Sequence, residues 1–152
     1  MAITASGLYL ETFMNALDDS NITVDLSHDT NNKIALFNNS ITPNFVSDTY
    51  YSASPYTSNE VTGTGWSAGG VALGTVTLTN QDSGGAGLKF DADNVSQAST
   101  TLSNAQGGLI YYNGTQSFCV CLVNFGGPYS TNNGTFAITW ATTGIFTIDL
   151  TP

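Results

Sequence analysis

The segment Gly65-Trp66-Ser67-Ala68-Gly69 matches G-x-S-x-G, the pattern around the nucleophilic serine of many hydrolases. That pattern works on a sharp turn between a strand and a following helix, and in α/β-hydrolases the histidine follows the serine in the chain. Here residues 71–79 are rich in β-branched side chains and alternate between apolar and polar types, which predicts a strand after the pattern. The only histidine, His28, precedes Ser67 and lies in a polar turn. We predict that Ser67 is not a nucleophile and that the chain is not an enzyme.

Two other patterns could bind a ligand. The glycine-rich region around Ser67 lacks the G-K-[S/T] sequence and the following helix of a phosphate-binding loop. Asp91, Asp93 and Asn94 have the spacing of calcium ligands, but the sixth and twelfth positions of that loop are Ser96 and Leu102 instead of Gly and Glu. We predict a solvated acidic turn, no cofactor and no catalytic set, with a structural Ca²⁺ or Mg²⁺ as the alternative.

The two cysteines, Cys119 and Cys121, lie two residues apart in an apolar run. On a regular strand both side chains point to one face, and a disulfide between them has poor geometry. A metal site would need further Cys or His ligands, and the chain has one His. We predict two buried thiols.

Tyrosine and tryptophan in loops with few charges are typical of protein–protein interfaces and of sugar-stacking surfaces. The alternative is that several of these rings close the ends of a β core. The candidate interface residues are Tyr50, Tyr51, Tyr56, Trp66, Tyr111 and Tyr129.

The charge of the chain limits its partners. Its 152 residues include two Lys, no Arg and eleven acidic residues, for a net charge of −9. Nucleic acids and anionic lipid surfaces are bound through Lys and Arg, so we expect neither as a partner. A basic protein surface would attract this chain, and solubility alone is the simpler explanation of the charge. The first residues lack the basic segment and the following apolar segment of a secretion signal, so we expect none. The sequence has no run of about 18 apolar residues, so we expect no membrane span.

The hydrophobic period changes along the chain. Residues 6–17 place Leu10, Phe13, Met14 and Leu17 at helical spacing, which predicts a short amphipathic helix with Ser6 as its N-cap. Residues 22–27 alternate and predict a half-buried strand, paired in a hairpin with residues 32–40. Residues 41–60 predict a long tyrosine-rich surface loop. Further strands are expected at 71–79, 87–92, 108–113, 117–125, 134–140 and 144–150.

Short strands separated by Asn- and Gly-rich turns are typical of a sandwich or barrel. Thr-rich, weakly charged composition also favours strands. We predict an all-β fold over residues 1–152, a single β-sandwich or β-barrel-like domain of about eight short strands with a short N-terminal helix.

Several longer motifs occur in a fixed order. They are TPNF at 42–45, SNEVTGTGWSAGGVAL at 58–73, KFDADNV at 89–95 and NAQGGLIYY at 104–112, followed by VNFGG and NGTFAITWATTGIFTIDL. With these motifs nearly the whole chain resembles a family of small virion proteins of tailed bacteriophages. One departure is Gln106, where the resemblance implies an arginine, so a salt bridge or capsid contact of that arginine is in doubt here.

The resemblance implies a capsid decoration (cement) protein. Such a protein attaches to the outer surface of the expanded head and bridges neighbouring subunits of the major capsid protein. The resemblance also implies a homo-oligomer, a trimer at three-fold or quasi-three-fold positions. Assembly in the bacterial host cytoplasm would keep both cysteines reduced. The alternatives are a tail, neck or fibre component, or a carbohydrate-binding module that uses Tyr50, Tyr51, Tyr56 and Trp66.

Overall fold

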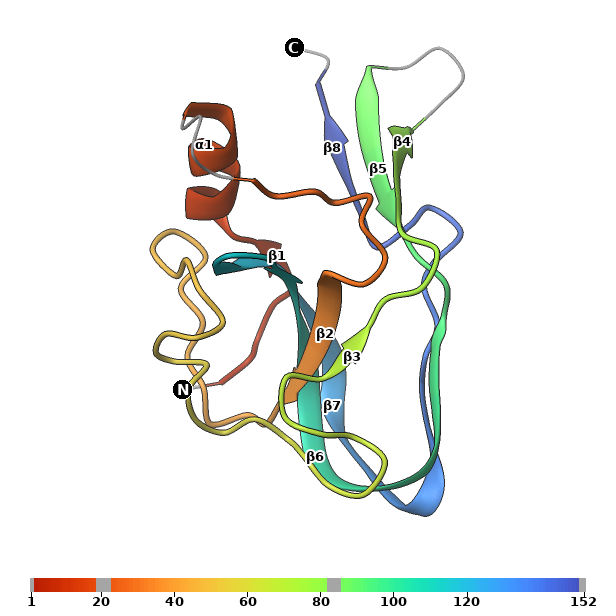
Figure 1. Ribbon diagram of the computed structural model, residues 1–152. Coiled ribbons are helices and arrows are strands. Elements are labelled where there is room, and N and C mark those ends of the chain that lie inside the picture. The colour runs from red at the N-terminus through yellow and green to blue at the C-terminus, as the bar shows by residue number, and fades with distance from the viewer. Residues whose placement is uncertain (1, 19–22, 82–85, 151–152) are drawn as a thin grey trace.

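Two long antiparallel strands, β6 (Val95–Asn113) and β7 (Ser117–Ile138), organise the molecule (Figure 1). The structure is a computed structural model that describes residues 2–18, 23–81 and 86–150. The two strands join through a short turn that contains Gly114, as the Asn-Gly pair in the sequence predicts. The sequence predicted only residues 108–113 of β6, and it divided β7 into two short strands at 117–125 and 134–140, because polar and glycine residues interrupt the apolar runs.

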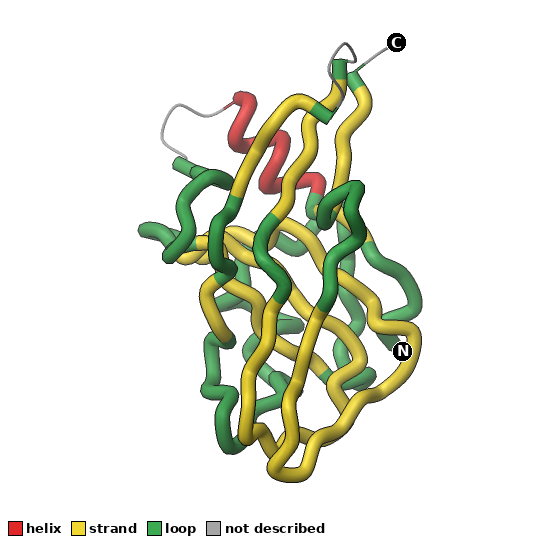
Figure 2. Tube along the Cα trace, turned by 90° about the vertical axis from the view of Figure 1, so that its right-hand side faces the viewer, coloured by secondary structure: helices red, strands yellow, loops and turns green. Residues whose placement is uncertain are grey.

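The hairpin bends in its middle and folds back on itself (Figure 2). Its register shifts repeatedly between Gln97 and Gly107, and β-bulges of this kind bend and twist a strand. Ser99 and Asn104 on β6 and Asn133 on β7 adopt left-handed backbone angles in this region. The bend brings residues near Val95 and Ile138 to face those near Ile110 and Val120, and so creates two layers from one hairpin.

Two antiparallel sheets result. The larger has the order β1 (Gly7–Leu8), β7, β6, β2 (Asn32–Phe37), β3 (Val71–Ala72), and the smaller has β4 (Thr77–Asn80), β5 (Gly87–Asp91), β8 (Phe146–Asp149). One helix, α1 (Leu10–Asp18), precedes β2. The predicted fold class is confirmed: the chain is mainly β, with two antiparallel sheets of about eight strands and one short N-terminal helix.

The larger sheet is covered on both faces. The first core lies between the two layers of the bent hairpin and contains Ile34, Ile110, Trp66, Phe90 and Phe136. The second core lies on the opposite face, under the N-terminal segment and residues 41–60. Strand β2 runs through the middle and buries nearly every residue, because a strand covered on both faces does not alternate.

The strand and hairpin predicted at residues 22–27 are wrong. Ile22 lies outside the described residues, and residues 23–27 form no strand. Both edges of β2 are already occupied by β6 and β3, so no edge remains for this segment. The side-chain amide of Asn32 instead donates to the carbonyls of Asp25 and His28, both at 2.9 Å, and holds the chain there in turns.

The helix begins later than predicted, and it exposes more of its apolar side chains than expected. Gly7 and Leu8 pair with Leu122 and Cys121 of β7, so the helix begins only at Leu10. Ser6 is therefore not its N-cap, and its hydroxyl accepts the N–H of Asn124 at 2.9 Å. Three of the four apolar residues are exposed: Leu10 at 46 %, Met14 at 52 % and Leu17 at 90 %.

The two cysteines do not share a face of the sheet. Ile110 pairs with Cys121 while Tyr111 pairs with Cys119, so Val120 is an extra residue at a bulge. Cys121 consequently lies in the first core and Cys119 in the second. Both are buried free thiols, and burial raises the pKa of Cys121 to about 12.

Candidate interaction surfaces

The loop at residues 41–60 has no helix and no named strand, as predicted, but it packs closely on the second core. Tyr9 and Tyr56 are both buried, and their hydroxyl groups hydrogen-bond to each other. The hydroxyl of Tyr56 also donates to Asp48 at 3.1 Å. Burial raises the pKa of both tyrosines far above the usual value. Tyr56 thus joins the loop to the core of its own chain.

A second group of hydrogen bonds connects this loop to residues 63–70, which we call the glycine-rich bend. The carboxylate of Glu60 accepts the hydroxyl of Tyr51 at 2.8 Å and the backbone N–H of Gly69 at 2.7 Å. Tyr111 donates to the carbonyl of Gly69 at 2.7 Å, and its ring stacks on Tyr51 with centroids 4.3 Å apart. Burial first, and Glu60 second, raise the pKa of Tyr111 to about 12. We call Tyr9, Tyr51, Tyr56 and Tyr111 the tyrosine layer.

Trp66 lies in the first core and is only 1 % exposed. Its ring meets Phe136 edge to face at a centroid distance of 5.6 Å. Residues Gly63 and Trp66 exchange backbone hydrogen bonds, which turns the side chain inward. Within the described residues its indole N–H has no hydrogen-bond partner. The glycine-rich bend therefore places the Trp66 ring between the two layers, where it fills the core.

Ser67 is exposed on the same bend. A tight turn follows it and leads directly to β3, so the element after the serine is a strand. The single strand predicted at 71–79 is divided into β3 and β4, which belong to different sheets. Gly70 explains the glycines here: its φ is +67°, and a Cβ would lie 1.8 Å from the carbonyl oxygen of Ile34. The sequence pattern thus describes a close approach of two backbones.

The remaining two candidates lie nearer the surface. Tyr50 is half-buried, and its ring packs on Phe118 with centroids 5.1 Å apart. Tyr129 is 55 % exposed. Of the six predicted interface residues, only Tyr129 offers a largely exposed ring. The structure gives Tyr51, Tyr56, Trp66 and Tyr111 roles inside the chain, and their contact with a partner stays a prediction.

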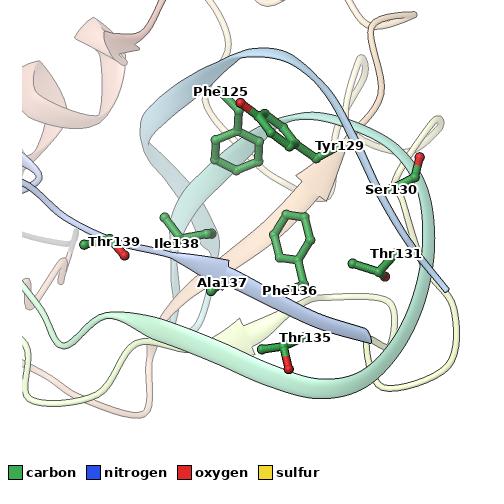
Figure 3. Close-up of a pocket in the computed structure, with 9 residues that line it drawn as sticks. All are labelled: Phe125, Tyr129, Ser130, Thr131, Thr135, Phe136, Ala137, Ile138 and Thr139. Atoms are coloured by element: carbon green, nitrogen blue, oxygen red, sulfur yellow. The ribbon is translucent and has the colours of Figure 1, made fainter. Parts of the chain in front are cut away.

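Tyr129 lines a trough formed by β7 where the strand bends back on itself (Figure 3). The trough has a volume of about 480 Å³. Phe125 lies between Tyr129 and Phe136, at centroid distances of 6.4 Å and 6.2 Å. Sequence reasoning did not single out Phe125 or Phe136. The available signal was the absence of any Asp, Glu, Lys, Arg or His from residue 125 to residue 139.

A second hollow lies between α1 and the smaller sheet. Its volume is about 660 Å³, and apolar side chains such as Phe13, Leu88 and Phe146 dominate its lining. Phe13 and Phe146 meet edge to face at 6.1 Å.

The charged groups mostly support local structure. Lys89 forms an ion pair with Asp91 at 2.9 Å and donates to the carbonyl of Thr142. Asp93 accepts the hydroxyl of Thr75 at 2.6 Å, and Asn94 accepts the backbone N–H of Trp140. In residues 2–18, 23–81 and 86–150 no group of three or more His, Cys, Asp or Glu side chains is placed to hold a metal ion.

Gln106, where the resemblance implies an arginine, is buried. Its side-chain amide donates to Asn124 at 3.0 Å and joins the two long strands at their bend. The position therefore has an internal partner in this chain.

These features define a mainly β protein of two antiparallel sheets. Comparison with models of known protein families, with curated proteins and with solved structures finds no match to this chain. Among the described residues, no helix has the length and apolar character needed to cross a membrane.

Proposed function

We propose that the chain is a structural protein of a tailed-phage virion that decorates the outer surface of the mature head. Its partner would be the major capsid protein, and it would act as a homo-oligomer, with the trimer implied by the resemblance as the expected form. Such a protein stabilises the expanded lattice by mass action, because it binds that form and adds its binding free energy to it.

The observation that supports this proposal most is the role of the motif at residues 58–73, the longest stretch of the resemblance. Glu60, Trp66, Gly69 and Gly70 from this motif all connect one layer of the fold to another. In these contacts the motif braces the framework of the fold. A preformed framework loses little entropy on binding, which suits a protein that must occupy many lattice sites.

The charge of the chain also supports a protein partner. With a net charge of −9, it is attracted to a basic surface and repelled by nucleic acid. We therefore expect salt to weaken attachment to the head, since screening reduces attraction between exposed charges.

The direct test is co-sedimentation of the purified chain with expanded heads, unexpanded heads and isolated tails of the phage that encodes it. The proposal predicts saturable binding to expanded heads at a fixed ratio to the major capsid protein, with little binding to unexpanded heads. Binding only to tails would favour the alternative of a tail, neck or fibre component. Binding to neither would contradict a virion role through these surfaces.

The carbohydrate-binding alternative has a specific difficulty at Trp66. A ring that is 1 % exposed cannot stack on a sugar unless the bend opens. Loss of glycan binding in Trp66→Ala would have to be separated from loss of folding before it supported that alternative.

A further inference from the structure

One edge of β7 lacks a neighbouring strand over much of its length. At the start of the strand this edge is covered by Tyr50, which bridges to Phe118, and by β1, which pairs with Cys121 and Leu122. Ser6 then accepts the N–H of Asn124. From residue 125 to the end of β7, β6 on the other edge is the only strand neighbour within the described residues. We call residues 125–139, which comprise this part of β7 and Thr139 directly after it, the β7 arm.

Two hydrogen bonds fix which backbone groups of the arm face outward. The carbonyl of Gly134 accepts the hydroxyl of Thr100 on β6 at 3.0 Å. The N–H of Trp140 donates to Asn94, next to the start of β6, at 2.8 Å. In an antiparallel strand the N–H and C=O of one residue point the same way, and the direction alternates along the chain. From Gly134 to Trp140, even-numbered residues therefore point to β6, and Thr135, Ala137 and Thr139 present both groups to the open edge. Asn133 lies outside this alternation, because its φ is positive and its N–H donates to Thr101 of β6.

Unpaired N–H and C=O groups in such a row match an extended peptide main chain. The side chains of Thr135, Ala137 and Thr139 are exposed, so none of them buries this edge. The trough lies along the same residues, with Phe125 and Tyr129 across from them (Figure 3). A strand added to the edge would find a concave surface with two aromatic rings beside it.

The distribution of charge indicates which molecule supplies that strand. Natural proteins commonly protect an open edge with charged residues, especially lysine. The β7 arm has none, although the chain as a whole carries a net charge of −9. Two copies of this chain repel each other over their acidic surfaces, and they meet at the lowest electrostatic cost where neither contributes a charge. A basic partner, in contrast, gains most from the carboxylates elsewhere on the surface.

We propose that the β7 arm pairs with the same arm of a second copy, antiparallel across a two-fold axis at Ala137. Ala137 then exchanges both backbone hydrogen bonds with the partner's Ala137, and Thr135 does so with the partner's Thr139. This deepens the homo-oligomer part of the proposed function but does not depend on attachment to a head. If trimers also form, the two-fold contact joins them in pairs.

The test is the mass of the chain in solution by sedimentation equilibrium, measured with three variants. Ala137→Pro removes an outward N–H, which an edge strand tolerates, and Ala137→Ser keeps it as the matched control. Ala137→Lys keeps the N–H but places like charges together at the axis. The wild type and Ala137→Ser should have twice the mass of Ala137→Pro, and in Ala137→Lys association should be weaker by about tenfold or more. Circular dichroism should show all four chains folded.

Two results would overturn the pairing. One is a wild-type chain with the mass of Ala137→Pro at all concentrations up to about 1 mM. The other is a doubled species that Ala137→Pro and Ala137→Lys retain, which would place the contact elsewhere. If such a chain still binds expanded heads, the two-fold pairing fails and the decoration proposal stands. If the pairing occurs and heads are not bound, the two-fold pairing stands and the decoration proposal fails.

Discussion

The tyrosine layer and the β7 arm contain similar aromatic residues in opposite environments. In the tyrosine layer each hydroxyl has a partner within the chain, such as Glu60 for Tyr51 and Gly69 for Tyr111. In the β7 arm, Tyr129 is 55 % exposed, and no second strand of the described part of the chain lies along the neighbouring backbone edge. A buried tyrosine needs a partner for its hydroxyl, whereas an exposed one can use water. The difference separates residues that hold the fold from residues that are free to meet a partner.

The largest effect should distinguish Trp66 from Tyr129. Trp66→Ala removes a large buried ring between the two layers, so we expect the free energy of unfolding to fall by about 3–5 kcal/mol. Tyr129→Ala removes a mostly exposed ring and should change it by less than about 0.5 kcal/mol. Urea unfolding followed by circular dichroism measures both. Equal losses in the two variants would remove the distinction between the regions.

The glycine-rich bend provides a matched pair of substitutions. Gly69 and Gly70 both have positive φ, at +83° and +67°, so alanine strains the backbone at either position by about 1–2 kcal/mol. At Gly70 the new Cβ would also collide with the carbonyl oxygen of Ile34. We expect Gly70→Ala to lower the free energy of unfolding by about 3 kcal/mol or more, through this overpacking. The bend is not a close backbone contact if the two variants are equally stable.

These contacts show what the sequence could and could not predict. Alternation and turn residues predicted the β class, the strands of β2 and β5, and the loop at 41–60, because those features are local. The pairing of β1 with β7 was missed because two residues have no detectable period. The separation of Cys119 from Cys121 depends on a bulge at Val120, which periodicity does not reveal.

The candidate site was harder to predict than the fold. Tyrosine and tryptophan in a loop-like sequence suggest exposure, yet the loop at 41–60 folds onto the sheet and buries Tyr56. Burial of this kind depends on contacts between distant segments, such as Tyr9 with Tyr56. The open edge of β7 depends on which strands lie beside it, so it also required the structure.

Glu60 should have an intermediate effect on stability. Its two carboxylate oxygens accept the hydroxyl of Tyr51 and the N–H of Gly69, and Glu60→Gln turns one acceptor into a donor. We expect a loss of about 1–3 kcal/mol in the free energy of unfolding. Asp18→Asn changes the net charge by the same amount at an exposed position and serves as the control. If both variants unfold at the same urea concentration, Glu60 does not brace the loop.

A smaller effect is expected from pH. The pKa of Tyr111 is about 12 in the folded chain, against a usual value near 10 in an unfolded chain. Below pH 10 both states keep the proton. Between about pH 10 and 12 the unfolded state ionises first, so the free energy of unfolding falls as pH rises. Urea midpoints from pH 8 to 12 should decline less steeply in Tyr111→Phe than in the wild type. If the urea midpoints of the two chains fall equally with pH, Tyr111 does not contribute to the pH dependence of stability.

The position of the chain in a reconstruction of the virion tests the proposed function most directly. We expect density for this fold on the outer surface of the expanded head, in contact with the major capsid protein. The tyrosine layer should remain packed inside each copy. Density confined to the tail or neck, or an absence of this fold from the head surface, would contradict the proposed function.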